Sequence, residues 1–290
     1  MSAVTLRQVG KSRSRARRRG LPVSPGVGIC ALVLALLALA VVWPGLFATH
    51  APDAVDPARA LLPPGSGHWF GTDQLGRDVY SRVVYGARPS LSIGLGATAI
   101  AVAAGSLLGV MAATSGRAVN ELIMRFADVL LAFPGLLLAL LVVAILGPGT
   151  GSATLAIGFS LTPGFIRLAR AQALVVRDSD YVRAAVVLGH RRTTVQFRHV
   201  FPNALPPLLV LALINVGTAV IAGSSLSFLG LGPRPPTPEW GSMLSEGRDF
   251  LQTAWALAVF PGLAVTATVL SVNVVGGSLR RRFEGRRPHD

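Results

Sequence analysis

The amino-acid sequence predicts an all-α, polytopic membrane protein with six transmembrane helices. Three observations support this fold class: 51% of the 290 residues are hydrophobic, only 14% are charged, and the charged residues leave five long stretches empty. A soluble protein carries about 25% charged residues. The high apolar content excludes a disordered chain, and the single cysteine excludes a disulfide-stabilised scaffold.

The charge-free stretches predict the individual spans. They are residues 20–49, 89–116, 129–166, 200–233 and 250–279. A helix needs about 20 residues to cross the hydrocarbon core, so four of the stretches fit one crossing each. The third stretch is long enough for two crossings, which the turn sequence Gly147-Pro-Gly-Thr-Gly151 separates. We therefore expect spans at residues 26–48, 90–114, 129–147, 152–168, 206–229 and 254–278.

The first of these stretches has two alternative interpretations. A buried helix of a soluble protein carries a polar stripe on one side, and residues 31–42 have no such stripe at any helical period. A cleaved signal peptide would also combine a basic start with an apolar segment. The segment is longer than is usual for a signal peptide and five further spans follow it, so we expect an uncleaved first helix.

The basic residues predict the orientation in the membrane. With the N-terminus in the cytoplasm, 21 of the 27 Lys and Arg residues fall on the cytoplasmic side and six on the other. This asymmetry follows the positive-inside rule and places both termini in the cytoplasm, where the basic flanks attract anionic membrane lipid. It also explains the net charge of +14 without a nucleic-acid partner. The basic cluster at residues 13–19 has no aromatic platform or nucleic-acid module beside it.

The expected domain organisation follows from the spans. It comprises a basic cytoplasmic tail (1–25), the first transmembrane helix (26–48), an extracytoplasmic loop with an interfacial segment (49–88), a core of five transmembrane helices (89–280) that includes a long cytoplasmic loop (170–206), and a second basic cytoplasmic tail (281–290). In the extracytoplasmic loop, Asp73, Arg77 and Asp78 are candidates for fixed ion pairs. We favour the alternative, in which they anchor an interfacial helix before the second span.

Several kinds of chemistry are missing from the sequence. A Walker A loop needs a lysine after its glycines, and the only lysine, Lys11, lies in the basic tail. The sequence has neither an HExxH motif nor a Cys/His cluster with zinc spacing. The interiors of the predicted spans contain no Asp, Glu, Lys, Arg or His and no acid–base or nucleophile–base pair. This argues against a carrier that works alone and against a membrane-embedded enzyme. A carrier that binds Na⁺ through backbone carbonyls stays open as an alternative.

Mildly polar residues inside the spans are candidates for lining a transport pathway. The strongest candidates are Ser160, Asn215, Thr218 and Asn273. For any one of them we favour the simpler role of hydrogen bonding between helices. Four others of the same kind are Thr162, Thr266, Thr268 and Ser271.

Proline and glycine in the spans predict kinks and close contacts. Pro134, Pro163 and Pro261 can each kink a helix, because proline removes a backbone donor. The Gly105-x-x-x-Gly109 motif lets two helices approach closely and predicts a contact between subunits.

The long cytoplasmic loop predicts a short capped helix. The segment Asp178-Ser-Asp180 suits a helix N-terminus. The helix would run from Tyr181 to Leu188, with Tyr181, Ala184, Ala185 and Leu188 on one face. Gly189 follows where a left-handed terminating residue is expected.

A second short helix is expected from Arg192 to Phe201, where Pro202 would stop it. Two arrangements are compatible with this pattern. One is a compact helix–turn–helix knob, and the other is an amphipathic linker lying on the membrane surface.

The same loop resembles the EAA loop of ABC importer permeases, whose pattern is E-A-A-x3-G-x9-I-x-L-P. Ala184, Ala185, Gly189 and Pro202 match at the required spacing. Arg183 replaces the Glu, and His199 and Phe201 replace the Ile and the Leu. These departures are similar to the variant of peptide importers, "YVRAA…LG…RHVLPN". Residues 71–91 and 227–244 resemble two further segments of that subfamily, and the resemblance covers residues 65–290.

The resemblance identifies the chain as a member of the binding-protein-dependent transport system inner-membrane component family, with the C-type permease of dipeptide/oligopeptide ABC importers as the best match. It implies a type I ABC importer permease fold in the bacterial plasma (inner) membrane. The implied partners are a homologous B-type permease, two ABC ATPase subunits that bind ATP and Mg, and an extracytoplasmic substrate-binding protein. The chain itself would be a non-catalytic subunit without a cofactor.

The implied function is import of di- or oligopeptides, with nickel or another small solute as the alternative. The residues implied in coupling to the ATPases are Tyr181, Arg183, Ala184, Ala185, Leu188, Gly189 and Pro202.

Overall fold

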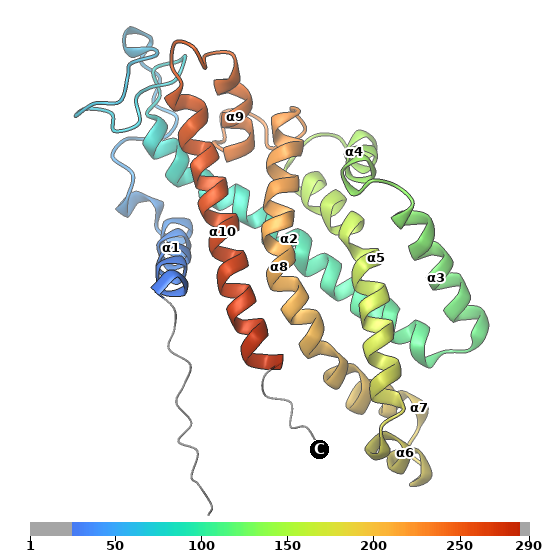
Figure 1. Cartoon of the computed structure of the whole chain (residues 1–290). Helices are drawn as coiled ribbons and strands as arrows, with labels where there is room; N and C mark the ends of the chain where they lie inside the picture. Colours follow the sequence, from blue (N-terminus) through green and yellow to red (C-terminus); the bar gives the residue numbers. More distant parts are fainter. Residues whose placement is uncertain (1–24, 285–290) are drawn as a thin grey trace, which may run out of the picture.

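The computed structural model describes residues 25–284, and within that range it contains helices and loops but no β-strand. The larger helices are α1 (Pro25–Val42), α2 (Val79–Thr114), α3 (Arg117–Leu131), α4 (Gly135–Leu146), α5 (Thr150–Arg177), α8 (Phe201–Phe228), α9 (Trp240–Arg248) and α10 (Ala256–Glu284) (Figure 1). The short helices are η1 (Pro44–Leu46), η2 (Pro57–Arg59), α6 (Asp180–Val187), α7 (Arg192–Thr194) and the π-helical segment η3 (Val195–Val200). The all-α prediction is confirmed. Most of the two expected basic tails, residues 1–24 and 285–290, lies outside the described residues.

The helices that can cross a membrane are fewer than the six expected. Within residues 25–284, four helices are long and apolar enough: α1, α2, the continuous η3–α8 helix, and α10. The bent pair α3 and α4 would add a fifth if it forms one span. Helix α5 is long enough but less apolar, because it contains several Ser, Thr and Gly residues and two arginines before its last residue, Arg177. The number six therefore stays a prediction.

The span expected at 129–147 is not one continuous helix. Helix α3 begins twelve residues earlier and ends at Leu131, α4 begins at Gly135, and the two helices meet at 96°. Pro134 causes the break, because proline has no backbone N–H and disfavours helical geometry in the residue before it, Phe133. The predicted effect of Pro134 is thus confirmed and is larger than a kink. Pro163 and Pro261 lie inside the continuous helices α5 and α10.

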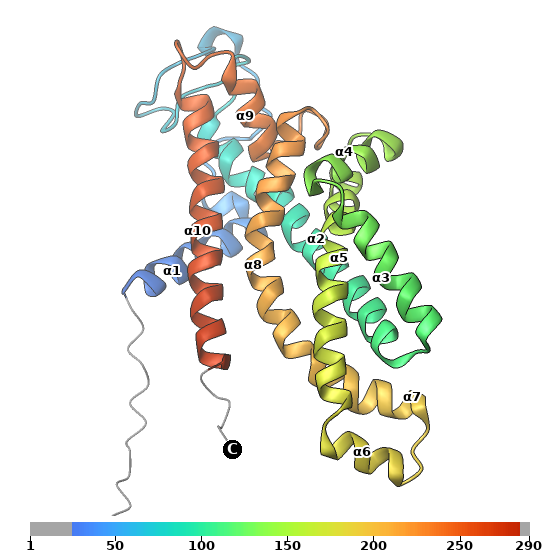
Figure 2. The ribbon, with the colours of Figure 1, turned by 45° about the vertical axis from the view of Figure 1, so that its right-hand side comes forward.

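The first two spans also differ from the expected limits. Helix α1 ends at Val42, before Pro44 and the 3-10 turn, and Figures 1 and 2 show that it runs across α10 and not alongside it. Helix α2 begins at Val79, so the expected interfacial segment before residue 89 is part of one 36-residue helix. The side chain of Asp78 caps this helix by accepting a hydrogen bond from the Ser81 amide at 2.8 Å.

Helix α2 packs against α5 at the centre of the bundle, and small residues make the contact possible. A Cβ atom on Gly105 would lie 2.3 Å from Cβ of Phe165, and one on Gly109 would lie 2.5 Å from the Ile166 carbonyl oxygen. The Gly105–Gly109 motif therefore faces α5 of the same chain. Its predicted role as a contact between subunits is wrong, because the close approach is already used inside this chain.

The two ends of the bundle are different. Helices α6 and α7 project at one end, together with the α2–α3 turn and the C-terminal end of α10 (Figure 2). Helix α9 and the loop of residues 43–78 lie at the opposite end. The structure thus groups the arginine-rich loops that the charge asymmetry assigns to one side of the membrane.

Candidate functional sites at the two ends of the bundle

The short helix α6 ends in the geometry that the sequence predicts. Gly189 has φ +82°, which is left-handed. The amide of Gly189 donates to the Val186 carbonyl at 3.0 Å, and the amide of His190 donates to the Ala185 carbonyl at 3.2 Å. This pair of hydrogen bonds is the Schellman motif. The prediction for Gly189 is confirmed, and the chain reverses direction immediately after α6.

The start of α6 and the end of the second helix differ from the prediction. Ser179 occupies the N-cap position, but its hydroxyl donates to the Val176 carbonyl at 2.5 Å and makes no capping bond. Pro202 does not stop a helix. The π-helical segment continues directly into α8, and Pro202 lies in the first turn of α8, a position where proline is tolerated.

The predicted docking face of α6 is divided between two environments. Ala185 is buried, together with Val182, against Val195 and Val200. Tyr181, Ala184 and Leu188 are exposed and share the outer face, and Leu188 is 78% exposed. The expectation that all four residues share one accessible face is wrong for Ala185, because the helix uses that side to pack on the bundle.

The exposed face of α6 is apolar and extends beyond the predicted residues. Val187 is 86% exposed, and Val186 and Phe197 are also exposed. Arg183 and Pro202 are exposed as well. An apolar surface on a projecting element is typical of a protein-binding site. Because α6 and α7 project from the end of the bundle (Figure 2), the knob interpretation is favoured over an amphipathic linker lying on the membrane surface.

The knob is attached to the ends of two long helices. The guanidinium of Arg177, at the end of α5, donates to the Ala113 carbonyl of α2 at 2.8 Å. A cavity of about 430 Å³ lies beside this bond, between the end of α2 and the inner side of α6 and η3. Val182 and Ala185 of α6 also belong to one buried cluster with Ala113 of α2 and Ala173 of α5. Displacement of α6 would therefore act on α2 and α5 together.

The four predicted pathway residues are distributed over helices α5, α8 and α10. Ser160 donates to the Ile157 carbonyl and Asn215 to the Leu211 carbonyl, so each bonds to its own helix. Thr218 is exposed on α8, and Asn273 of α10 lies beside Gly217. The hydroxyls of Thr162, Thr266 and Thr268 also bond within their helices, and Ser271 is buried. These side chains were expected to bond between helices, but each of these hydrogen bonds lies within one helix.

A different set of polar residues lines a cavity inside the bundle. It has a volume of about 730 Å³, lies between α5 and α8 near the α6 end, and includes Gln172 and Asn203 among mostly apolar side chains. Neither residue was predicted, because both lie outside the expected spans at 152–168 and 206–229. The observed helices extend to Arg177 and begin at Phe201, which brings both residues into the bundle.

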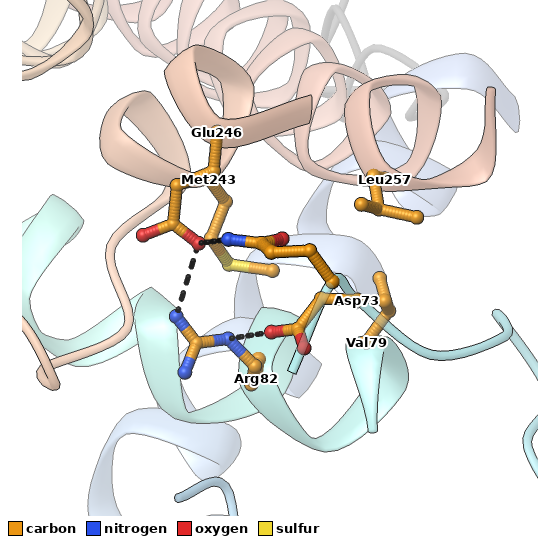
Figure 3. A pocket seen from close by; sticks show the side chains of 7 residues that line it. Asp73, Val79, Arg82, Met243, Glu246 and Leu257 are labelled. Atoms are coloured by element: carbon orange, nitrogen blue, oxygen red, sulfur yellow. Dashed lines mark hydrogen bonds and ion pairs between the residues drawn. The ribbon is translucent and has the colours of Figure 1, made fainter. Parts of the chain in front are cut away.

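At the opposite end, a buried ion network joins α2 to α9. Arg77 donates from Nε to Asp73 at 2.6 Å and from Nη2 to Glu246 at 3.1 Å. Figure 3 shows Arg82 reaching toward the same two carboxylates, at 3.6 Å and 3.8 Å. Asp73, Arg77 and Arg82 are each less than 5% exposed. The ion-pair interpretation of Asp73 and Arg77 is confirmed. The anchoring role at the membrane surface stays a prediction.

Asp78 has a separate environment. One carboxylate oxygen accepts from the Ser81 amide, and the other lies 2.8 Å from Nδ1 of His68. Burial alone would raise the pKa of Asp78, but the hydrogen bonds with Ser81 and His68 outweigh it, so its pKa is lowered from the ordinary value. Asp78 is therefore a fixed carboxylate at the start of α2.

Glu239 is a buried carboxylate that the sequence did not single out. It is fully buried and caps α9, because its two oxygens accept from the amides of Gly241 and Ser242. The hydroxyl of Ser90 in α2 donates to the same carboxylate at 2.9 Å, and the indole of Trp240 donates to the Val83 carbonyl. The sequence signal that could have identified it is an acidic residue directly before the short helix α9. Glu239 ties the outer segment rigidly to α2.

Replacing Glu239 with Gln is expected to lower the free energy of unfolding by about 1–2 kcal/mol, since the amide group offers one acceptor and leaves a buried N–H without a partner. Thermal unfolding of the chain in detergent measures the effect. The control is Glu121→Gln, which removes an exposed pair with Arg117 and should cost less than about 0.5 kcal/mol. Equal effects of the two substitutions would contradict the assigned role of Glu239.

Comparisons with known proteins add independent information. The family model described as binding-protein-dependent transport system inner membrane component matches residues 105–287. The probable D,D-dipeptide transport system permease protein DdpC of Escherichia coli (strain K12) is 40% identical over 89% of this chain and 86% of that protein. The glutathione transport system permease protein GsiD of Escherichia coli O6:K15:H31 (strain 536 / UPEC) is 45% identical over 75% of this chain and 72% of that protein.

Solved structures show the same fold. A chain of the MetNI methionine ABC transporter, in inward-facing conformations, superimposes with a TM-score of 0.56 and 15% sequence identity. The alignment covers 69% of this chain and 95% of that chain. At this level of identity the similarity concerns the fold alone.

Proposed function

The chain belongs to the family of binding-protein-dependent transport system inner-membrane components, and we propose that it is a permease subunit of an ATP-driven importer of di- or oligopeptides. It would form the translocation pathway together with a homologous B-type permease. Two ABC ATPase subunits would bind ATP and Mg, and an extracytoplasmic binding protein would deliver the substrate. In this assembly the chain is a non-catalytic subunit of the bacterial plasma membrane.

The similarity to peptide permeases carries the proposal. The probable D,D-dipeptide permease of Escherichia coli shares 40% identity with nearly the whole chain. A dipeptide transport system permease protein, DppC of Alkalihalophilus pseudofirmus, shares 39% identity over 86% of it. The relatives DdpC, DppC and GsiD are named for dipeptide and glutathione transport, which favours peptides over the alternative, nickel.

We place the α6 end of the bundle in the cytoplasm, with both termini on that side. The arginine-rich loops lie at this end, and the positive-inside rule favours the cytoplasm for them. The exposed face of Tyr181, Ala184 and Leu188 would then dock into a cleft of an ATPase subunit. Because the knob shares a buried cluster with α2 and α5, and Arg177 at the end of α5 bonds to α2, closure of the ATPases would move α2 and α5 as a rigid body.

Substituting Leu188 with Glu is expected to weaken copurification of the ATPase subunits at least about tenfold, because a charge would enter an apolar contact. Leu188 is 78% exposed, so the chain itself should fold. The matched control is Val55→Glu, an exposed apolar residue at the opposite end that should leave copurification unchanged. Full ATPase recovery with Leu188→Glu would show that this face is not the docking site.

Reconstitution tests the substrate class. The chain is placed in proteoliposomes with its partner permease, the two ATPases and the binding protein, and uptake of a labelled dipeptide and of Ni²⁺ is compared with and without ATP. We expect ATP-dependent dipeptide uptake. Uptake of Ni²⁺ but not of peptides would contradict the proposed substrate class, and uptake by the chain alone without ATP would identify a carrier.

A further inference from the structure

Two histidines and one aspartate meet at the end of the bundle that carries α9. His50, His68 and Asp78 each offer one ligand atom, and these three atoms lie within 4.8 Å of one another. The residues come from three separate segments: the turn after η1, the loop before α2, and the residue that caps α2. Neither the ion network around Glu246 nor the proposed docking knob uses them.

The surrounding structure fixes each of the three side chains. Asp78 is held by the Ser81 amide at 2.8 Å, and its side chain is 1% exposed. Nδ1 of His68 lies 2.8 Å from the Asp78 carboxylate, and the side chain of His68 is 11% exposed. The hydroxyl of Ser81 accepts hydrogen bonds from the amides of Thr49 and His50, which positions the backbone of His50 over the start of α2.

We propose that His50, His68 and Asp78 form a binding site for a divalent transition-metal ion that prefers imidazole ligands, Zn²⁺ above all. Two imidazoles and one carboxylate, with a fourth position for water, form a known type of zinc ligand set. Ligand atoms in a tetrahedral zinc site lie about 3.3 Å apart, as bond lengths of about 2.0–2.2 Å require. Nδ1 of His50 lies 3.8 Å from Asp78 and Nδ1 of His68 lies 2.8 Å from it, so small side-chain rotations would complete the site.

Charge and access favour the ion. Arg82, the first cationic residue along α2, is directed to Asp73 and Glu246, and also approaches Asp53. Asp78 supplies a negative charge at the site itself. The side chain of His50 is 42% exposed, which gives an ion a path from solvent. The hydrogen bond from the Ser81 amide fixes the orientation of the Asp78 carboxylate. In metal sites, hydrogen bonds from surrounding residues orient the metal-binding side chains in the same way.

The bound ion would join the outer loop to the core of the bundle. His50 and Asp78 are 28 positions apart in the sequence, and His68 lies between them. The segment between His50 and Asp78 has only one short 3-10 helix, η2. A metal bridge would therefore hold this loop against α2 and lower its mobility, in addition to the hydrogen bonds already present.

The test uses the full chain, purified in detergent with a tag that contains no histidine and treated with a chelator. Zn²⁺ is then titrated in competition with a chromogenic chelator. We expect one ion per chain and an increase in the thermal unfolding midpoint with Zn²⁺ concentration, since binding only to the folded state stabilises it. The double variant His50→Gln/His68→Gln should bind at least about tenfold more weakly.

Two further variants make the result specific. His190→Gln/His199→Gln removes the other histidine pair, whose rings lie 6.2 Å apart at the α6 end, and should retain full binding. His50→Gln alone alters only a partly exposed side chain and should fold normally, yet lose the Zn²⁺-dependent stabilisation. The proposal is overturned if the wild-type chain shows no saturable site at micromolar Zn²⁺, or if the His50 and His68 variants bind as tightly as wild type.

Discussion

Replacing Gly189 with Val is expected to abolish ATP-driven transport while leaving the chain folded. Gly189 has φ +82° and forms the turn that ends α6. An L-residue in this conformation costs roughly 1–2 kcal/mol, and a β-branched residue is especially unfavourable there. The strain would be relieved by rotating or unwinding α6, which carries the exposed face of Tyr181, Ala184 and Leu188.

The cause would be backbone conformation and not lack of space. A Cβ atom at Gly189 would meet no other atom within 4 Å. The loss of transport should therefore depend on how readily the new residue adopts a left-handed backbone conformation and not on its volume. Replacing Gly189 with Asn should have the mildest effect, Ala an intermediate effect and Val the most severe effect. The matched control is Gly116→Val at the same end of the bundle, where space is also open but φ is −67°.

The measurement is the ratio of peptide uptake to ATP hydrolysis in the reconstituted complex. Gly189→Val should lower this ratio at least about tenfold, whereas Gly116→Val should leave it unchanged. Size-exclusion chromatography shows whether each variant is folded and assembled. Wild-type transport by the Gly189→Val complex would refute the role assigned to this turn.

The features that local sequence determines were predictable. Gly189 followed a run that fits one short helix, and its position after that run indicated a left-handed terminator, which the backbone confirms. Pro134 indicated a kink in the third hydrophobic stretch, and the helix is interrupted there. The charge-free stretches indicated where long apolar helices lie, because an apolar run of about 20 residues without charge is typical of a membrane-spanning helix.

The features that depend on packing were not predictable. Contacts with Val195 and Val200 decide which side of α6 faces the bundle. Ala185 is buried in these contacts, although the sequence predicted it on the docking face. Pro202 indicates a helix stop or a helix start equally well, and only the π-helical segment before it decides between them. His50, His68 and Asp78 lie far apart in the sequence, so their meeting follows only from the fold.

The packing of α2 against α5 was also not predictable, and it has the largest expected effect on the stability of the chain. The sequence showed that Gly105 and Gly109 allow close packing but did not show which helix uses it. A Cβ atom on Gly109 would lie 2.5 Å from the Cβ of Ala169, 2.5 Å from the Ile166 carbonyl oxygen and 2.9 Å from the Arg170 amide nitrogen. Two of these three neighbours are backbone atoms, which cannot rotate away as a flexible side chain can.

Replacing Gly109 with Leu is therefore expected to destabilise the chain by at least about 3 kcal/mol, because helices α2 and α5 would have to separate. Helix propensity acts in the opposite direction, since Leu is favoured over Gly by nearly 1 kcal/mol inside a helix. The matched control is Gly164→Leu on α5, where the glycine is exposed and a Cβ atom meets nothing within 4 Å. Thermal unfolding in detergent should show a large loss for Gly109→Leu and none for Gly164→Leu. If Gly109→Leu were as stable as the control, α2 and α5 would not pack through this glycine.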